Sequence, residues 1–273
     1  MMADGVGRLL PGLAVLAVAG VLARAAGAAT PVDPVVVGLA VAVVVLGVGF
    51  GELAGRRAGV DRQTRALLAS GASVCGVSAV LAVASSIDGD EAAVAYAVGT
   101  VLLFDAVTLV AFLVAGAVLG LSDRVFGVWA GLSLFSTGPA AAAGFAVSET
   151  AGQWATVTKL ARNAFIGVVA VTYAVSHTGR GRTDAAEVWT RFPKFVVGFL
   201  LVAALTNAGV LDAAARDAVS TVGDWLFTLA FVGLGVELNP RRLRLAGARP
   251  VAVVLAHFLT VTALAFLAVG TLL

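Results

Sequence analysis

Ser70-Gly-Ala-Ser-Val-Cys-Gly-Val-Ser78 lies in the middle of a long apolar stretch, where a simple membrane anchor would carry leucine and valine. Gly71 and Gly76 weaken a helix, and the serine hydroxyls can bond the backbone groups that a break would free. The run predicts a discontinuous helix whose half-helix ends present amides or carbonyls to a solute. A close-packed helix crossing, which small residues also permit, is the competing interpretation.

The composition of the whole chain places this run in a lipid bilayer. The chain has 273 residues, of which 60% are hydrophobic and only 12% charged, whereas a soluble domain carries about 25% charged residues. Each transmembrane helix needs about 20 mostly apolar residues. We therefore expect an all-α, polytopic membrane protein with about nine transmembrane helices in a single domain, residues 1–273. The apolar stretches cover approximately 9–28, 34–54, 64–87, 92–119, 125–147, 152–176, 192–210, 217–238 and 250–272.

The basic residues beside alternate stretches predict the orientation of the chain. Fourteen of them, including Arg56 and Arg124, fall on one predicted side, and two fall on the other, together with Asp33 and Asp88. This bias predicts a multi-pass protein of the cell membrane with a cytoplasmic N-terminus and an external C-terminus. Because the basic residues cluster in short loops, we interpret them as topology signals and expect no nucleic-acid partner.

A second interrupted stretch, Phe231-Val-Gly-Leu-Gly-Val-Glu-Leu238, contains Gly233 and Gly235. It lies in the eighth predicted span, which crosses in the direction opposite to the third. Paired broken helices of opposite direction are typical of an inverted repeat with a binding site at the midplane. We therefore expect an incomplete first repeat at about 9–119 and a second at about 125–273.

The fifth predicted span contains Trp129-Ala-Gly-Leu-Ser-Leu-Phe-Ser-Thr-Gly-Pro-Ala140. Gly138-Pro139 must kink or break a helix here, because proline lacks the backbone N–H and clashes with the preceding turn. Ser133, Ser136 and Thr137 can supply the missing hydrogen bonds.

The sixth predicted span carries Lys159, Arg162 and Asn163 in an otherwise apolar helix. A charge near the bilayer centre costs about 2.5–3.5 kcal/mol on insertion scales, so such groups normally face a partner or an aqueous cavity. Snorkelling of Lys159 to the interface is the alternative. Asp105, in the middle of the fourth span, is either a structural counter-ion for these cations or a carrier of coupling protons.

These observations define the candidate site. We expect no metal ion and no cofactor in it. The predicted substrate-binding residues are Ser73, Cys75, Gly76, Ser78, Ser133, Ser136, Lys159, Arg162, Asn163, Gly233 and Gly235, and Asp105 is the predicted ion-pair or coupling residue.

Four motifs carry a resemblance to a known family. Gly71-Ala-Ser-Val-Cys-Gly-Val-Ser-Ala79 and Trp129-Ala-Gly131 are the most specific, and Thr158-Lys-Leu-Ala-Arg162 and Arg191-Phe-Pro-Lys-Phe-Val-Val-Gly-Phe199 complete the set. In this order they resemble the sulfate exporter family of YeiH-type membrane proteins, over roughly residues 55–273. The resemblance implies export of small oxyanions or sulfonate-derived anions. It also implies the antiporter and bile-acid symporter fold, which is built from inverted five-helix repeats with two broken helices that cross.

The chain departs from that family in two respects. Family members usually have about eleven spans, so about two are lacking near the N-terminus. The fifth span usually carries Ile-His-Glu-Val-x-Gln, whereas this chain has Leu134-Phe-Ser-Thr-Gly-Pro139, with Phe135 and Ser136 at the His and Glu positions. Proton coupling through that motif is therefore excluded, while anion binding is compatible with it.

The predicted function is a secondary transporter that exports a small anion such as sulfate, sulfite or a sulfonate by alternating access, and homo-oligomers are compatible with the sequence. Two alternatives stay open. Ser73 and His257 could form the dyad of an intramembrane hydrolase, and interrupted helices also occur in channels or in non-transporting scaffolds. The sequence contains no phosphate-binding Walker motif, which argues against ATP drive within this chain.

Overall fold

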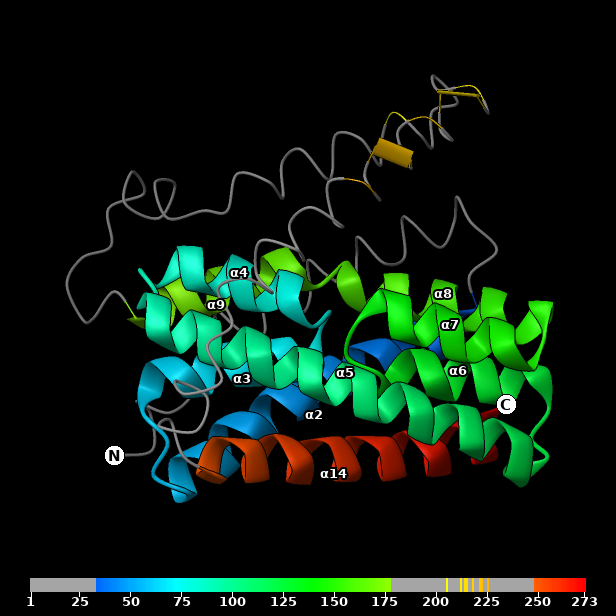
Figure 1. The fold of residues 1–273 in the computed structure, drawn as a ribbon, viewed down its shortest axis with the longest axis horizontal. Coiled ribbons are helices and arrows are strands. Elements are labelled where there is room, and N and C mark those ends of the chain that lie inside the picture. Colours follow the sequence, from blue (N-terminus) through cyan, green and yellow to red (C-terminus); the bar gives the residue numbers. More distant parts are fainter. Residues whose placement is uncertain are drawn as a thin grey trace.

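The computed structural model describes residues 33–177 and 248–273, with a few single residues between 205 and 225. Within these ranges every regular element is an α-helix (Figure 1). The predicted spans at 9–28, 192–210 and 217–238 lie outside the two ranges, as do Gly233 and Gly235. The predicted number of nine helices and the two predicted repeats therefore stay predictions.

Three described helices are long and apolar enough to cross a membrane: α2 (Pro34–Arg57), α5 (Glu91–Leu119) and α14 (Ala248–Leu272). They confirm the apolar stretches predicted at 34–54, 92–119 and 250–272. Acidic caps begin two of them, because an unpaired N–H at a helix start needs an acceptor. The Asp33 carboxylate accepts the N–H of Val35 at 2.8 Å, and Asp90 accepts the N–H groups of Ala92 and Ala93.

The third predicted span is discontinuous, as expected, but it does not cross the molecule. Helix α3 (Arg62–Ser73) ends in the interior, and α4 (Val77–Ser86) turns back along it. The Gln63 Nε2 amide donates to the Asp88 carbonyl at 3.3 Å, which joins the outer ends of the two helices. Gly76 makes the turn with a φ of 70°, a backbone conformation that glycine adopts without a steric penalty. The pair is a re-entrant hairpin.

The fifth predicted span is a second re-entrant hairpin, formed by α6 (Asp123–Ser133) and α7 (Thr137–Val147). Both helices pack against α8 (Glu149–Asn163). The Ala151 carbonyl of α8 lies beside Gly127 near the outer end of α6, and 2.8 Å from where a Cβ on Gly144 of α7 would lie. The outer ends of both hairpin helices therefore lie together, and the predicted break before Gly138-Pro139 is confirmed.

The sixth predicted span consists of two helices, α8 and α9 (Ile166–His177), where the sequence predicted one. The break falls at Ala164 and Phe165, where the Phe165 N–H donates to the Arg162 carbonyl at 3.1 Å in a tighter turn. Figure 1 shows α8 and α9 following one another along the long axis of the molecule, parallel to α5 and α14.

The hairpins overturn part of the predicted topology. Arg124 forms a salt bridge with Asp33, although the charge count placed these residues on opposite sides. Asp88 lies beside Gln63, at the same end of the molecule as Arg62, and its predicted place on the opposite side is wrong. The physical reason is that each hairpin returns the chain to the end it came from. We call the end with most of the described arginines the basic end; it carries Arg56, Arg57, Arg62, Arg65 and Arg249.

Two units of the same design follow one another along the chain. Each begins with a hairpin and continues with a helix or helix pair that traverses the molecule: α3, α4 and α5, then α6, α7, α8 and α9. The first hairpin enters from the basic end and the second from the opposite end. The run Gly131-Leu-Ser133 repeats the pattern of Gly71-Ala-Ser73 at the equivalent place. In the described residues, the inverted pair is therefore formed by the third and fifth predicted spans.

Candidate functional site

The tips of the two hairpins meet in the interior, and we call this place the tip junction. It consists of Val74–Gly76 from the first hairpin and Leu134–Ser136 from the second. The approach is close, because a Cβ on Gly76 would overlap the Ser136 hydroxyl and would lie 3.3 Å from Val101 Cγ1. Helix α5 therefore runs beside both tips, and Asp105 sits at this level.

Lys159 links the two tips directly. Its side chain is fully buried, and Nζ donates to the carbonyls of Val74 and Leu134, each at 2.8 Å. These carbonyls follow the last turns of α3 and α6, where helix carbonyls lack intrahelical partners and the helix dipole is negative. The ammonium group thus neutralises two half-helix ends at once. The snorkelling alternative for Lys159 is wrong.

Arg162 lies beside Lys159 and acts on the same two helix ends. Its NH1 group donates to the carbonyls of Gly131, Leu132 and Leu134 at 2.7–3.1 Å. Its NH2 group donates to the carbonyls of Ala72 and Ser73 at 3.2 and 2.8 Å. Arg162 is fully buried, and its Nε has no partner among the described residues. The guanidinium therefore holds the last turns of α3 and α6 together.

Asp105 bonds neither cation in the described part of the chain, where the two salt bridges are elsewhere. One carboxylate oxygen accepts the Ser136 N–H at 3.0 Å and the other accepts the Ser136 hydroxyl. Ser136 is the residue that precedes α7. Asp105 thus supplies, from another helix, the acceptor that a helix start requires.

Helices α4 and α7 differ from the other described helix starts. Neither has a side-chain cap from its own first residue. Both starts lie at the tip junction with their amides and the positive ends of their dipoles. The five helices that start near the surface have such caps, from Asp33, Asp61, Asp90, Ser122 and Ser148.

The other predicted site residues in the described ranges also lie at or beside the junction. Cys75 and Ser133 are buried, and the Ser133 hydroxyl has no partner in the described part. Ser78 is half-buried in the first turn of α4. The Asn163 amide donates to the Thr137 hydroxyl at 3.0 Å and so fixes the start of α7. Thr137 itself was not among the predicted site residues.

Ser73 forms the contact that the hydrolase alternative requires. Its hydroxyl lies 3.1 Å from His257 Nε2, but that nitrogen is also 3.1 Å from the Gly47 carbonyl. A carbonyl only accepts hydrogen bonds, so Nε2 carries the proton and cannot take one from Ser73. The other ring nitrogen, Nδ1, has no described partner to orient it. Both side chains are buried, and the contact suits a structural hydrogen bond.

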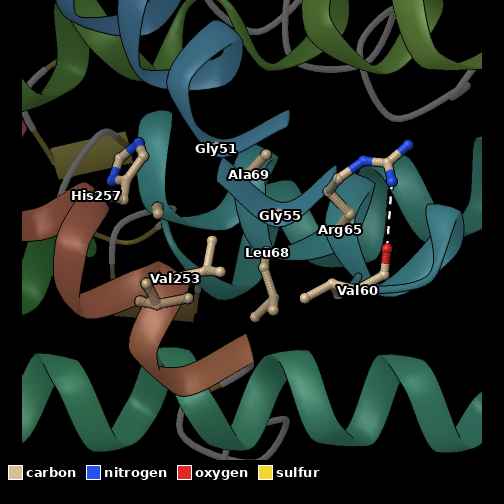
Figure 2. A pocket seen from close by; sticks show the side chains of 10 residues that line it. Gly51, Gly55, Val60, Arg65, Leu68, Ala69, Val253 and His257 are labelled. Carbon is tan, nitrogen blue, oxygen red and sulfur yellow. Dashed lines mark hydrogen bonds between the residues drawn. The ribbon is translucent and has the colours of Figure 1, made fainter. Parts of the chain in front are cut away.

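The space beside His257 is small. Figure 2 shows a narrow cavity between His257 at one end and Arg65 at the other, with Gly51, Ala69 and Leu68 along it. Its volume is about 10 Å³, which is the room that about one water molecule needs. No substrate for hydrolysis fits in this cavity.

The comparisons with known proteins agree on one family. A family model described as "Conserved hypothetical protein 698" matches residues 28–254. A UPF0324 membrane protein of Nitratidesulfovibrio vulgaris is 33% identical over 201 residues, which cover 70% of this chain. A UPF0324 membrane protein of Agrobacterium fabrum is 31% identical over 85% of this chain and 65% of its own length. The UPF0324 membrane protein TauZ of Paracoccus denitrificans is 27% identical over 90% of this chain and 73% of its own length.

The chain covers only part of these relatives. The match spans 56% of the length of the Nitratidesulfovibrio vulgaris protein. No solved structure matches the chain.

Proposed function

We propose that this chain, which belongs to the YeiH-type family of UPF0324 membrane proteins, is a secondary transporter that exports a small anion such as sulfate, sulfite or a sulfonate by alternating access. One observation carries the proposal: the uncapped starts of α4 and α7 meet beside two buried cations. Helix starts bind anions because their free N–H groups and positive dipole ends point toward the ligand.

In this proposal the start of α7 makes the main contact. Ser136 and Thr137 are half-buried and Gly138 is exposed, so this end can be reached by a solute. Ser78, in the first turn of α4, faces the same junction from the other hairpin. Buried oxyanion sites in proteins combine backbone amides with hydroxyl groups in this way.

Lys159 and Arg162 act in this proposal through their charge and through the geometry of the tips. Their donors are already bonded to carbonyls, apart from Arg162 Nε. A positive charge in surroundings of low dielectric acts over several ångströms, so both cations favour an anion at the junction without direct contact. Asp105 opposes an anion, and its release from Ser136 would couple protonation to binding.

Alternating access follows from the arrangement of the hairpins. Because the two hairpins enter from opposite ends, withdrawal of one tip opens the junction toward one end of the molecule and withdrawal of the other tip opens it toward the opposite end. By the positive-inside rule the basic end faces the cytoplasm, so the first hairpin is the cytoplasmic gate and the second the external one. Members with two such gates transport by exposing one midplane site in turn.

A ligand-stabilisation screen tests the proposal. Purified protein in detergent is heated with sulfate, sulfite, short alkyl sulfonates or carboxylates, against chloride at equal ionic strength. A specific anion raises the apparent melting temperature, because binding at 100 times Kd stabilises by about 2.7 kcal/mol. Thr137→Val should abolish that shift, while Thr156→Val, on the same side of the molecule but bonded within α8, should keep it.

The same screen and a flux assay separate the alternatives. Absence of any selective shift contradicts the proposal. In reconstituted vesicles, a transporter saturates with anion concentration, whereas a channel gives a linear flux and a scaffold gives none. The hydrolase alternative predicts that Ser73 reacts with a fluorophosphonate probe, which the buried Ser73–His257 pair should not do.

A further inference from the structure

A second cavity lies apart from the tip junction, between α2 and α9, and we call it the α2–α9 groove. Its volume is about 540 Å³, within the range of about 300–1,000 Å³ that is usual for small-molecule sites. In the described part of the chain α9 packs mainly against α4, not α2, which leaves the groove between them. Its walls are formed by Val41, Val44, Val45, Val48, Gly49, Glu52, Arg62, Arg65, Phe165, Val168, Val169, Thr172, Tyr173, Ser176 and His177.

The groove is apolar along its length and polar at one end. Valines of α2 and α9 line it from the level of Phe165, at the break between α8 and α9, toward the basic end. From Val41 to Glu52 the helix rises about 16 Å. That distance is close to half of the hydrocarbon core, which is about 30 Å thick. The groove therefore has the depth of one bilayer leaflet.

The polar end carries a positive charge that its own acid does not balance. Both oxygens of Glu52 are occupied, one by Arg65 Nε at 2.6 Å and the other by the Tyr173 hydroxyl at 3.0 Å. Arg62 donates through NH2 to the Ser176 carbonyl, and no described carboxylate lies within salt-bridge distance of it. His177 Nε2, in the same wall, is buried without a described partner.

We propose that the α2–α9 groove binds one phospholipid with an anionic head group, whose phosphate lies at Arg62 and whose acyl chain runs between the valines toward Phe165. The charge at the mouth is complementary to such a head group, and basic pockets between transmembrane helices at the cytoplasmic face bind anionic lipids. The apolar wall excludes a fully hydrated inorganic ion. This site is separate from the anion site of the proposed function.

Glycines of α2 offer a matched pair of variants. A Cβ on Gly49 would meet no atom within 4 Å, and Gly49 lines the groove. A Cβ on Gly38, on the same helix, would also meet no atom within 4 Å, and Gly38 does not line it. Gly49→Phe therefore fills the groove without disturbing helix packing, and Gly38→Phe is the control. Arg62→Gln is likewise matched by Arg57→Gln, an exposed arginine outside the groove.

The experiment is native mass spectrometry of the full chain in detergent, titrated with phosphatidylglycerol or phosphatidylcholine. The wild type, Gly38→Phe and Arg57→Gln should retain one phosphatidylglycerol in preference to phosphatidylcholine. Arg62→Gln should weaken that binding about fivefold, since one basic residue near the membrane surface contributes about 1 kcal/mol. Gly49→Phe should abolish it.

Two outcomes overturn the proposal. The first is equal retention of the two lipids by the wild type, or of phosphatidylglycerol by Gly49→Phe. The second is retention of the lipid by Gly49→Phe together with loss of stabilisation by a short alkyl sulfonate, which would make the groove a vestibule for the solute. Lipid binding is measured without transport, so failure of the anion screen leaves this result readable.

Discussion

The two hairpins share one design but differ at their tips. The first turns through Gly76, with a positive φ, and its tip residues Val74, Cys75 and Gly76 are all buried. The second turns without a positive φ in the described residues and places a half-buried Ser136 at its tip, bonded to Asp105. The start of α4 is enclosed, whereas the start of α7 continues into the exposed Gly138.

This difference separates two tasks within one symmetrical frame. The first tip is fixed by packing and by carbonyl bonds to Lys159 and Arg162. The second tip has the same carbonyl bonds, but its amide end is held by side chains that can exchange partners: Asp105 and Asn163. A rigid tip facing an adjustable one can form a site for a solute without loss of the fold.

The largest expected effect is an all-or-none difference in labelling from the two sides of a membrane. In a Cys75→Ala background, Arg57→Cys and Glu91→Cys should react with an impermeant thiol reagent from one side, and Asp123→Cys and Glu149→Cys from the other. A continuous helix at 64–87 would instead put position 91 with position 149. Labelling of positions 57 and 91 from opposite sides would remove both hairpins from the fold.

Removal of the ammonium group that joins the tips should have the next largest effect. Lys159→Met leaves the Val74 and Leu134 carbonyls buried without a donor, and loss of one partner from a buried charged contact costs about 3–5 kcal/mol. The measurement is the thermal unfolding of purified protein. Gln153→Met, at an exposed position of the same helix, should change stability little. A Lys159→Met protein as stable as the wild type would show that the tips do not depend on this link.

The two tips can be compared directly through one glycine of each hairpin. Gly76→Ala should cost at least about 1–2 kcal/mol, because a Cβ disfavours the positive φ and would overlap Ser136. Gly138→Ala should be tolerated, since its Cβ would meet no atom within 4 Å. Thermal unfolding measures both. Equal stability of the two variants would contradict the contrast between an enclosed and an open tip.

The smallest effect concerns the cap that α5 supplies to α7. Ser136→Ala and Asp105→Asn should each destabilise by about 0.5–2 kcal/mol, the usual contribution of a helix cap. The double variant should lose less than the sum of the two, because both changes remove the same contact. Strict additivity in a double-mutant cycle would show that Asp105 acts elsewhere than on Ser136.

Much of the fold could be predicted from the sequence, because apolar length and helix-breaking residues are local properties. The spans at 34–54, 92–119 and 250–272 and the breaks within 64–87 and 125–147 all follow from them. The direction of the chain after a break could not be predicted in this way. It depends on long-range packing, such as α4 on α3 and Gly144 against Ala151.

The candidate site was predictable in its residue types but not in its bonds. Lys159 and Arg162 were singled out because buried charges need partners, and both are buried at the tip junction. Their partners are backbone carbonyls, which every residue has, so no side-chain pattern announces them. The repeated Gly-x-Ser run at Gly71 and Gly131 is the signal that could have paired the third span with the fifth.

The return of the chain at each hairpin has a consequence for how such a protein can change its sequence. A hairpin contributes an even number of half-crossings, so it leaves the sidedness of everything downstream unaltered, and α14 keeps the orientation that the charge count assigned to it. A mutation that straightened the Gly76 turn into a through-going helix would change that parity. All later loops would then face the wrong compartment, including the exposed Arg249 beside Gly59. Selection against inverted insertion therefore acts on the turn-forming residue as strongly as selection for the site itself.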